Sequence, residues 1–99
     1  MNKNPLEIIK ELDLKLFDLV SQNNEFTFKD GALPSKTKYL IALALDAAHG
    51  AVNGVRSLSL QALKYGASKE EIMEALHVSN FISGVGSIYT ASAGLKDVF

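Results

Sequence analysis

The sequence lacks cysteine and tryptophan altogether and contains only two prolines. Without a thiol, the chain can form no disulfide, no Cys-x-x-Cys redox pair and no cysteine-ligated zinc site, and it has no thiolate nucleophile. Neither sign of charge is in excess, since ten lysines and arginines are matched by eleven aspartates and glutamates, for a net charge of -1. A near-neutral chain gives no electrostatic reason to bind nucleic acid, and we expect no such partner.

A long hydrophobic run is also missing. The most apolar window covers residues 39–48 and is interrupted by Asp46. It is about half as long as the roughly 20 residues that a bilayer requires. Charges are spread among the apolar positions of the first 20 residues, whereas a secretory signal peptide has an uninterrupted apolar segment. We therefore expect a cytoplasmic protein with no membrane partner.

What is present is typical of one globular domain. Hydrophobic residues make up 47% of the chain and charged residues 21%, a balance that favours a packed core over a disordered chain. Apolar residues recur three and four positions apart along much of the sequence, which is helical spacing. The sequence therefore predicts a single all-α domain over residues 1–99, built from about four to five helices, in which residues 1–32 form an N-terminal helix and loop.

Start and stop signals predict where these helices lie. The first helix should begin at Asn4 and Pro5, an N-cap followed by a first-turn proline, and end at the polar run 21–24. A connection over residues 24–33 should follow, with its two phenylalanines filling part of the core. Later helices are expected over 51–65, with Gly66 behind it, and from Ser68 onward, where Ser68 and Glu71 form a capping-box pattern. The sequence itself carries all of these signals.

The second helix should begin at Pro34 and Ser35, and its central part has no polar face. From Tyr39 to Leu45 every residue is apolar apart from the tyrosine hydroxyl. Such a helix must be covered on all sides, and a protomer of four or five short helices can cover only part of it. We therefore expect a homo-oligomer, with this helix at a subunit interface.

Two segments of this region resemble the carboxymuconolactone decarboxylase family, and more narrowly its AhpD-like branch. They are Leu33-Pro34-Ser35-Lys36, which precedes the apolar helix, and the run ALKYGASKEEIMEA over residues 62–75. The resemblance covers about residues 33–95. It implies an all-α fold whose members assemble as trimers or hexamers.

The resemblance also implies where the family's catalytic groups would fall. Its two cysteines fall at Ala51 and Gly54, the histidine after them at Leu58, the histidine between them at Asn53, and the proton-relay glutamate near Tyr39. All of these positions depart from the family pattern. Dithiol peroxidase activity is therefore not expected, because it requires a thiolate. The lactone decarboxylase branch shares the histidine that is leucine here.

His49 is the most suggestive residue for any remaining chemistry. Asp46 precedes it by three residues on the same helix face, and a carboxylate so placed can orient an imidazole and raise its basicity. Asn53, Arg56 and His77 are candidate ligand-binding residues, of which Arg56 could bind a carboxylate or phosphate. His49 with Asp46 would then act as a general base on a small carboxylate or lactone.

Purely structural roles are open alternatives for the same residues. A histidine in a last helical turn followed by Gly50 is an ordinary stop signal, and its charge would favour the C-terminus of the helix. His77 could face His49 and, with Asp46, bind a metal, but no histidine pair has i, i+4 spacing, and we expect neither a metal nor a cofactor. Two hypotheses follow: a homo-oligomeric binding or structural scaffold, for which a small molecule could be the ligand, or a cysteine-independent enzyme.

Overall fold

The computed structural model describes residues 5–99, and this part of the chain contains six helices and no strand. The helices are α1 (Glu7–Leu12), α2 (Leu14–Phe28), α3 (Ser35–Ala48), α4 (Val52–Lys64), α5 (Lys69–Ser83) and α6 (Gly86–Leu95). The all-α prediction is confirmed, with more helices than the four to five expected. None of the helices between residues 5 and 99 is both long and apolar enough to cross a membrane.

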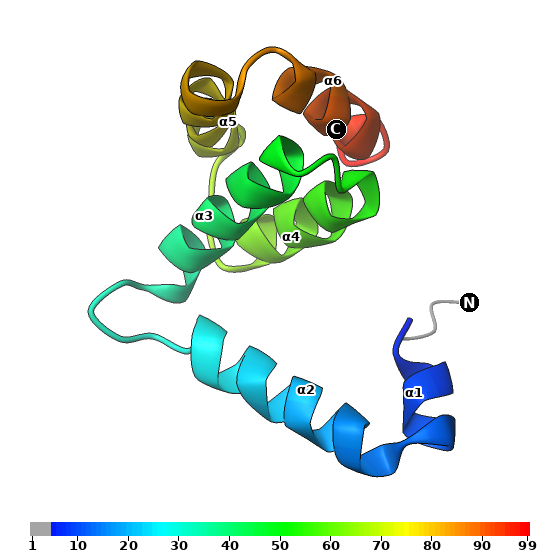
Figure 1. The fold of residues 1–99 in the computed structure, drawn as a ribbon. Coiled ribbons are helices and arrows are strands. Elements are labelled where there is room, and N and C mark those ends of the chain that lie inside the picture. Colours follow the sequence, from blue (N-terminus) through cyan, green and yellow to red (C-terminus); the bar gives the residue numbers. More distant parts are fainter. Residues whose placement is uncertain (1–4) are drawn as a thin grey trace.

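Helices α3 to α6 form a compact bundle (Figure 1). Helix α3 packs against α4 and α5, and α6 packs against α4 and α5. Leu43, Val55 and Ile72, one each from α3, α4 and α5, are fully buried at the centre. The core is small because many of its other members are alanines, which allow the helix axes to approach closely.

The starts of α5 and α3 are fixed by local hydrogen bonds. The Ser68 hydroxyl accepts a hydrogen bond from the Glu71 N–H at 3.0 Å, and the Glu71 carboxylate accepts one from the Ser68 N–H at 2.8 Å. The predicted capping box is therefore confirmed. At the start of α3 the Asp30 carboxylate accepts a hydrogen bond from the Ser35 N–H at 2.7 Å.

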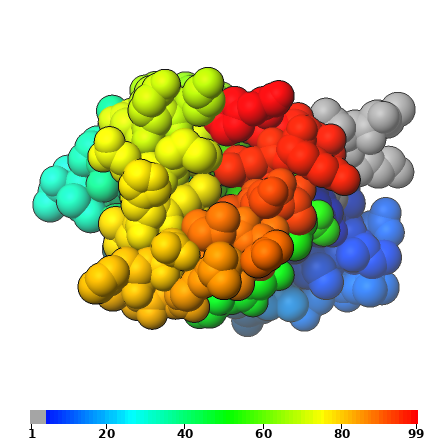
Figure 2. Space-filling model, turned by 90° about the horizontal axis from the view of Figure 1, so that it is seen from above, coloured from blue at the N-terminus to red at the C-terminus, as the bar shows by residue number. Residues whose placement is uncertain are grey.

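Helices α1 and α2 form an arm that projects from the bundle (Figures 1 and 2). Neither helix contains a buried residue. The prediction of one helix ending at residues 21–24 is wrong in two respects. The first helix ends at Leu12, and Asp13 separates it from a second helix. The Asp13 carboxylate accepts a hydrogen bond from the Leu16 N–H at 3.0 Å and so caps the start of that second helix. That helix then runs through the polar stretch to Phe28, while the expected cap at Asn4 lies outside the described residues.

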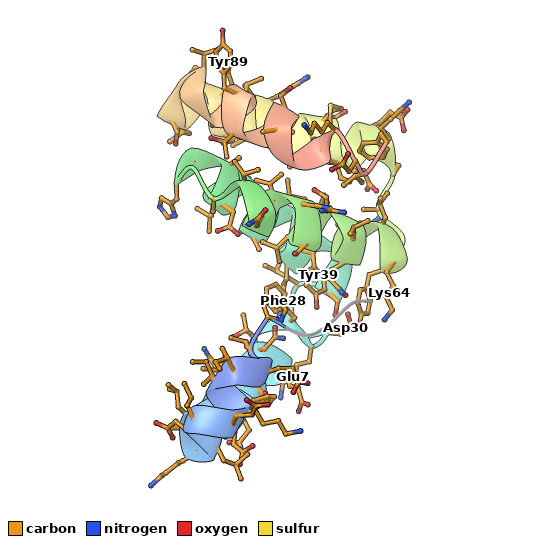
Figure 3. The ribbon with its side chains drawn as sticks, turned by 90° about the vertical axis from the view of Figure 1, so that its right-hand side faces the viewer. Glu7, Phe28, Asp30, Tyr39, Lys64 and Tyr89 are labelled. Atoms are coloured by element: carbon orange, nitrogen blue, oxygen red, sulfur yellow. The ribbon has the colours of Figure 1, made fainter. Side chains whose placement is uncertain are left out.

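The predicted connection over 24–33 is correspondingly shorter, and only one of its phenylalanines packs on the bundle. Phe28 stacks on Tyr39 of α3 with ring centroids 4.3 Å apart, and the two rings lie side by side in Figure 3. Phe26 is 70% exposed, because it lies on the opposite side of α2. The polar residues 21–24 do not end the helix. The helix continues to Phe28, whose ring packs on Tyr39 and so stabilises the last turn.

The chain exposes more surface than a compact monomer of its mass. Its accessible area is 6937 Å², whereas a compact monomer of 10.7 kDa is expected to expose about 5,500 Å². The difference is about 1,400 Å², and the arm, in which neither helix contains a buried residue, contributes to it.

Candidate functional site

The turn between α3 and α4 contains His49, the leading candidate from the sequence. His49 is the C-cap residue of α3, and its backbone N–H donates to the Leu45 carbonyl at 3.0 Å. Gly50 follows with a φ of 79°, in the left-handed region that glycine tolerates. The imidazole is exposed and, within residues 5–99, makes no hydrogen bond or ion pair. His49 therefore occupies the helix-stop position, with its ring free to meet solvent or a ligand.

Asp46 lies one turn earlier on α3 and points at α4. Its carboxylate lies directly against Gly54, where an added Cβ would come within 2.7 Å of the Asp46 Cγ. The side chain is partly buried and has no hydrogen-bond partner among the described residues. Gly54 is therefore the residue that lets the two helices accommodate this carboxylate between them.

The other sequence candidates are dispersed over the surface. Asn53 and Arg56 are exposed on α4, and His77 is exposed on α5. Among residues 5–99 no group of three or more His, Cys, Asp or Glu side chains is close enough to hold a metal ion. The structure thus does not bring His49, Asp46 and His77 together as the metal site considered from the sequence.

The sequence reasoning missed an apolar groove between α3 and α5. The groove has a volume of about 340 Å³, and Ile41, Leu45, Val78 and Ile82 contribute to its walls. None of the predicted site residues lines it. Its signal is present in the sequence, because 41 and 45, and likewise 78 and 82, are i, i+4 pairs that place apolar side chains on one helix face.

Tyr39, where the resemblance places a proton-relay glutamate, lies in an aromatic stack. Its ring lies between Phe28 and Tyr65, with centroid distances of 4.3 and 5.4 Å. Burial raises the pKa of Tyr39, and Tyr65 adds to the increase. Its phenol therefore remains protonated at neutral pH and joins the arm to the bundle rather than serving as a base.

Comparison with known proteins decides the family. The model of the carboxymuconolactone decarboxylase family matches residues 14–97. The chain belongs to the carboxymuconolactone decarboxylase family. The matched segment includes α2, so most of the projecting arm is part of the family module, beyond the region 33–95 that carried the resemblance.

A solved structure supports the same assignment. A carboxymuconolactone decarboxylase family protein from Legionella pneumophila, crystallised in its apo form, is 31% identical to this chain. The match covers 92% of this chain and 81% of that protein, with a TM-score of 0.86. No curated protein matches the chain.

Within this family fold, the place of the expected thiols is chemically different. Ala51 precedes α4, and Gly54 in its first turn lies under the Asp46 carboxylate. Leu58, where the resemblance places the catalytic histidine, is partly buried and packs on the core. The α3–α4 junction thus offers a carboxylate and a nearby exposed imidazole, and no thiol.

Proposed function

We propose that this carboxymuconolactone decarboxylase family protein is a homo-oligomer, a trimer or a hexamer, that acts as a binding or structural scaffold without dithiol chemistry. The observation that carries the proposal is the uncovered apolar surface of the protomer. The total accessible surface of the chain, 6937 Å², is about 1,400 Å² larger than expected for a compact monomer of its mass, and each partner buries roughly 800 Å² in an interface of standard size.

Many of the uncovered apolar side chains on the bundle lie at the α3–α5 groove, in the α5–α6 turn and on α6. Phe81 is 85% exposed, and Ile82 and Tyr89 are each 75% exposed. Tyr89 projects outward from α6 at the far end from the arm (Figure 3). The chain has no charged residue from 78 to 95, so no ionic side chain of this segment favours contact with water. A patch of this kind is typical of an interaction surface.

The native mass tests this proposal. Wild-type protein should sediment as a trimer or hexamer at micromolar concentration. Ala44→Glu, which places a carboxylate in the apolar groove, should cause dissociation or unfolding, because the buried charge would lack a partner. Ala32→Glu adds the same charge in the exposed loop before α3 and should leave the mass unchanged.

A second candidate function is acid–base chemistry at the α3–α4 junction. It is favoured by the Asp46 carboxylate, which lies against Gly54, where the resemblance places the family's second thiol. When a carboxylated lactone loses CO₂, the electron pair of the broken C–C bond remains on carbon, which then takes up a proton. The exposed imidazole of His49, one turn from Asp46, could deliver that proton.

Turnover measurements distinguish the two functions. If the enzyme hypothesis holds, purified protein releases CO₂ from a carboxylated muconolactone, and His49→Ala and Asp46→Asn each remove this activity while the melting temperature changes little. If wild-type protein shows no turnover and both variants melt at lower temperature, His49 acts as a helix cap, whose contribution is about 1 kcal/mol or less.

A further inference from the structure

We propose that a groove between α5 and α6 binds a small carboxylate with an apolar chain, of the medium-chain fatty acid class, and that Lys69 and Lys96 bind its carboxylate. This groove shares no lining residue with the α3–α5 groove, and it does not include the α3–α4 junction. The inference goes beyond the scaffold function proposed above and does not depend on the number of subunits.

The groove has a firm floor and adaptable walls. Helices α5 and α6 lie side by side on the face of the bundle shown in Figure 2, α5 in yellow and α6 in orange. The groove between them has a volume of about 440 Å³, within the range of about 300–1,000 Å³ that is usual for small-molecule sites. Leu76, Ala91 and Leu95 line it and belong to the buried core. Met73 and Phe99, which also line it, are 36% and 55% exposed, and a methionine adapts readily to the shape of a ligand.

The groove is polarised along its length. Lys69 is the first residue of α5, and Lys96 directly follows α6. Because only residues 84 and 85 join the two helices, the start of α5 and the end of α6 lie together at the other end of the pair, and both line the groove. The remaining lining residues are apolar apart from Ser92. The groove therefore has a cationic end and an apolar body.

The two lysines have no partner of opposite charge. Within residues 5–99 neither ammonium group makes an ion pair or a hydrogen bond, and no acidic side chain of these residues lines the groove. Helix stability does not explain Lys69, because a positive charge at the first position of a helix is unfavourable. Two unpaired cations beside an apolar groove are complementary to a ligand that carries an anionic group on an apolar chain.

The dimensions of the groove set the length of that chain. Lys69 and Leu76 are seven residues apart on one face of α5, which corresponds to about 10 Å along the helix. The extended chain of octanoate has a comparable length. A neutral apolar ligand would leave the two charges unused, and an inorganic anion would leave the apolar walls in water. A medium-chain carboxylate contacts both.

Calorimetric titration with octanoate tests the proposal. Wild-type protein should bind octanoate saturably, at one site per chain. The double variant Lys69→Gln, Lys96→Gln should bind it about two- to tenfold more weakly, the range expected for two exposed ionic contacts. Binding of the uncharged probe 1-octanol should be the same in this variant and the wild type. Lys64→Gln removes an exposed lysine outside the groove and should leave octanoate binding unchanged.

A second pair of variants locates the bound chain. Ser92 lines the groove, whereas its neighbour Ala93 does not, and both are exposed. Ser92→Trp should fill the groove and abolish binding of both probes, and Ala93→Trp should bind them as the wild type does. Circular dichroism and the native mass are measured on the same samples, so that a loss of folding or assembly is recognised directly.

The possible failures of this proposal are distinct from those of the scaffold proposal. If the wild type does not bind octanoate, or if both tryptophan variants bind it equally, the α5–α6 site is wrong, whatever the native mass. If the double lysine variant loses affinity for 1-octanol as much as for octanoate, the lysines do not bind the carboxylate. A folded monomer that binds octanoate with the expected pattern would support this site and contradict the homo-oligomer.

Discussion

Two glycines of the same helix, α6, have opposite structural roles. A Cβ on Gly94 would lie 2.7 Å from the Val52 carbonyl oxygen and 2.9 Å from the Val55 Cβ, whereas a Cβ on Gly86 would meet nothing within 4 Å. Gly94→Ala should lower the free energy of unfolding by about 1–3 kcal/mol, because backbone on α4 cannot move aside cheaply.

Gly86→Ala is the matched control for that substitution. It should be neutral or stabilising by up to about 1 kcal/mol, since alanine favours the helix. Chemical denaturation at one fixed protein concentration measures both variants. Equal effects of the two substitutions would contradict the close approach of α4 and α6 at Gly94.

Ser59 carries a buried hydroxyl without a partner. Its side chain is fully buried in α4, and its Oγ makes no hydrogen bond. An unsatisfied buried polar group costs about 1–3 kcal/mol, so Ser59→Ala should leave stability unchanged or raise it by about 1 kcal/mol. Ser79→Ala is the contrasting variant, because the Ser79 hydroxyl donates to the Ala44 carbonyl at 3.2 Å, and it should destabilise. The melting temperatures of the two variants, each compared with that of the wild-type protein, test this prediction, and a lower melting temperature for Ser59→Ala would contradict it.

Single residues with local signals were predictable from the sequence, and those with tertiary roles were not. The Ser68–Glu71 capping box and the helix stop at His49 and Gly50 follow from neighbours in the chain. The contact of Asp46 with Gly54 depends on how α3 crosses α4, and no spacing rule contains that geometry. The functional roles of His49, Asp46, Asn53, Arg56 and His77 stay predictions.

At the scale of elements, the starts of α3 and α5 make stability depend on pH. Hydrogen bonding from the Ser35 backbone N–H, followed by the Ser35 side chain, lowers the pKa of Asp30 from its ordinary 3.8. The Ser68 backbone N–H, followed by the Lys36 side chain, lowers the pKa of Glu71 from 4.5. Both charged carboxylates therefore stabilise the fold above their ordinary pKa values, and this contribution is lost as the pH falls through the lowered ones.

The measurement is the denaturation midpoint followed from pH 6 down to about pH 3. Wild-type protein should lose stability toward acid, and Asp30→Asn and Glu71→Gln should each make that loss smaller while lowering stability at neutral pH. Glu70→Gln, on the exposed side of the same first turn of α5, serves as a control. If both variants show the same pH profile as the wild-type protein, these two carboxylates do not cause the loss of stability in acid.

The all-helical class was predictable, whereas the number of helices and two boundaries in the arm were not. Periodicity predicted the bundle helices, because their apolar faces meet a common core. In the arm, Asp13 was one more polar residue in an amphipathic run, and only its cap on Leu16 marks the break. The stack of Phe28 on Tyr39 joins α2 to α3, so a tertiary contact overrode the stop signal at residues 21–24.

At the scale of the whole molecule, the absence of thiols limits the chemistry. Purified protein should neither reduce a hydroperoxide with a dithiol donor nor reduce a disulfide, because no residue can form the mixed disulfide that these reactions pass through. Restoring cysteines at Ala51 and Gly54 should not create an efficient site, since the Asp46 carboxylate already lies against position 54. Dithiol-dependent turnover by wild-type protein, free of contaminating enzymes, would contradict this prediction.

The central claim is that the protomer completes its fold by binding copies of itself. Sedimentation velocity of the wild-type protein, across a dilution series around micromolar concentration, tests it most directly. The exposed apolar surface around the α3–α5 groove and on α2 predicts a single trimeric or hexameric species that resists dilution. A well-folded monomer with the helical content of the structure would contradict the claim.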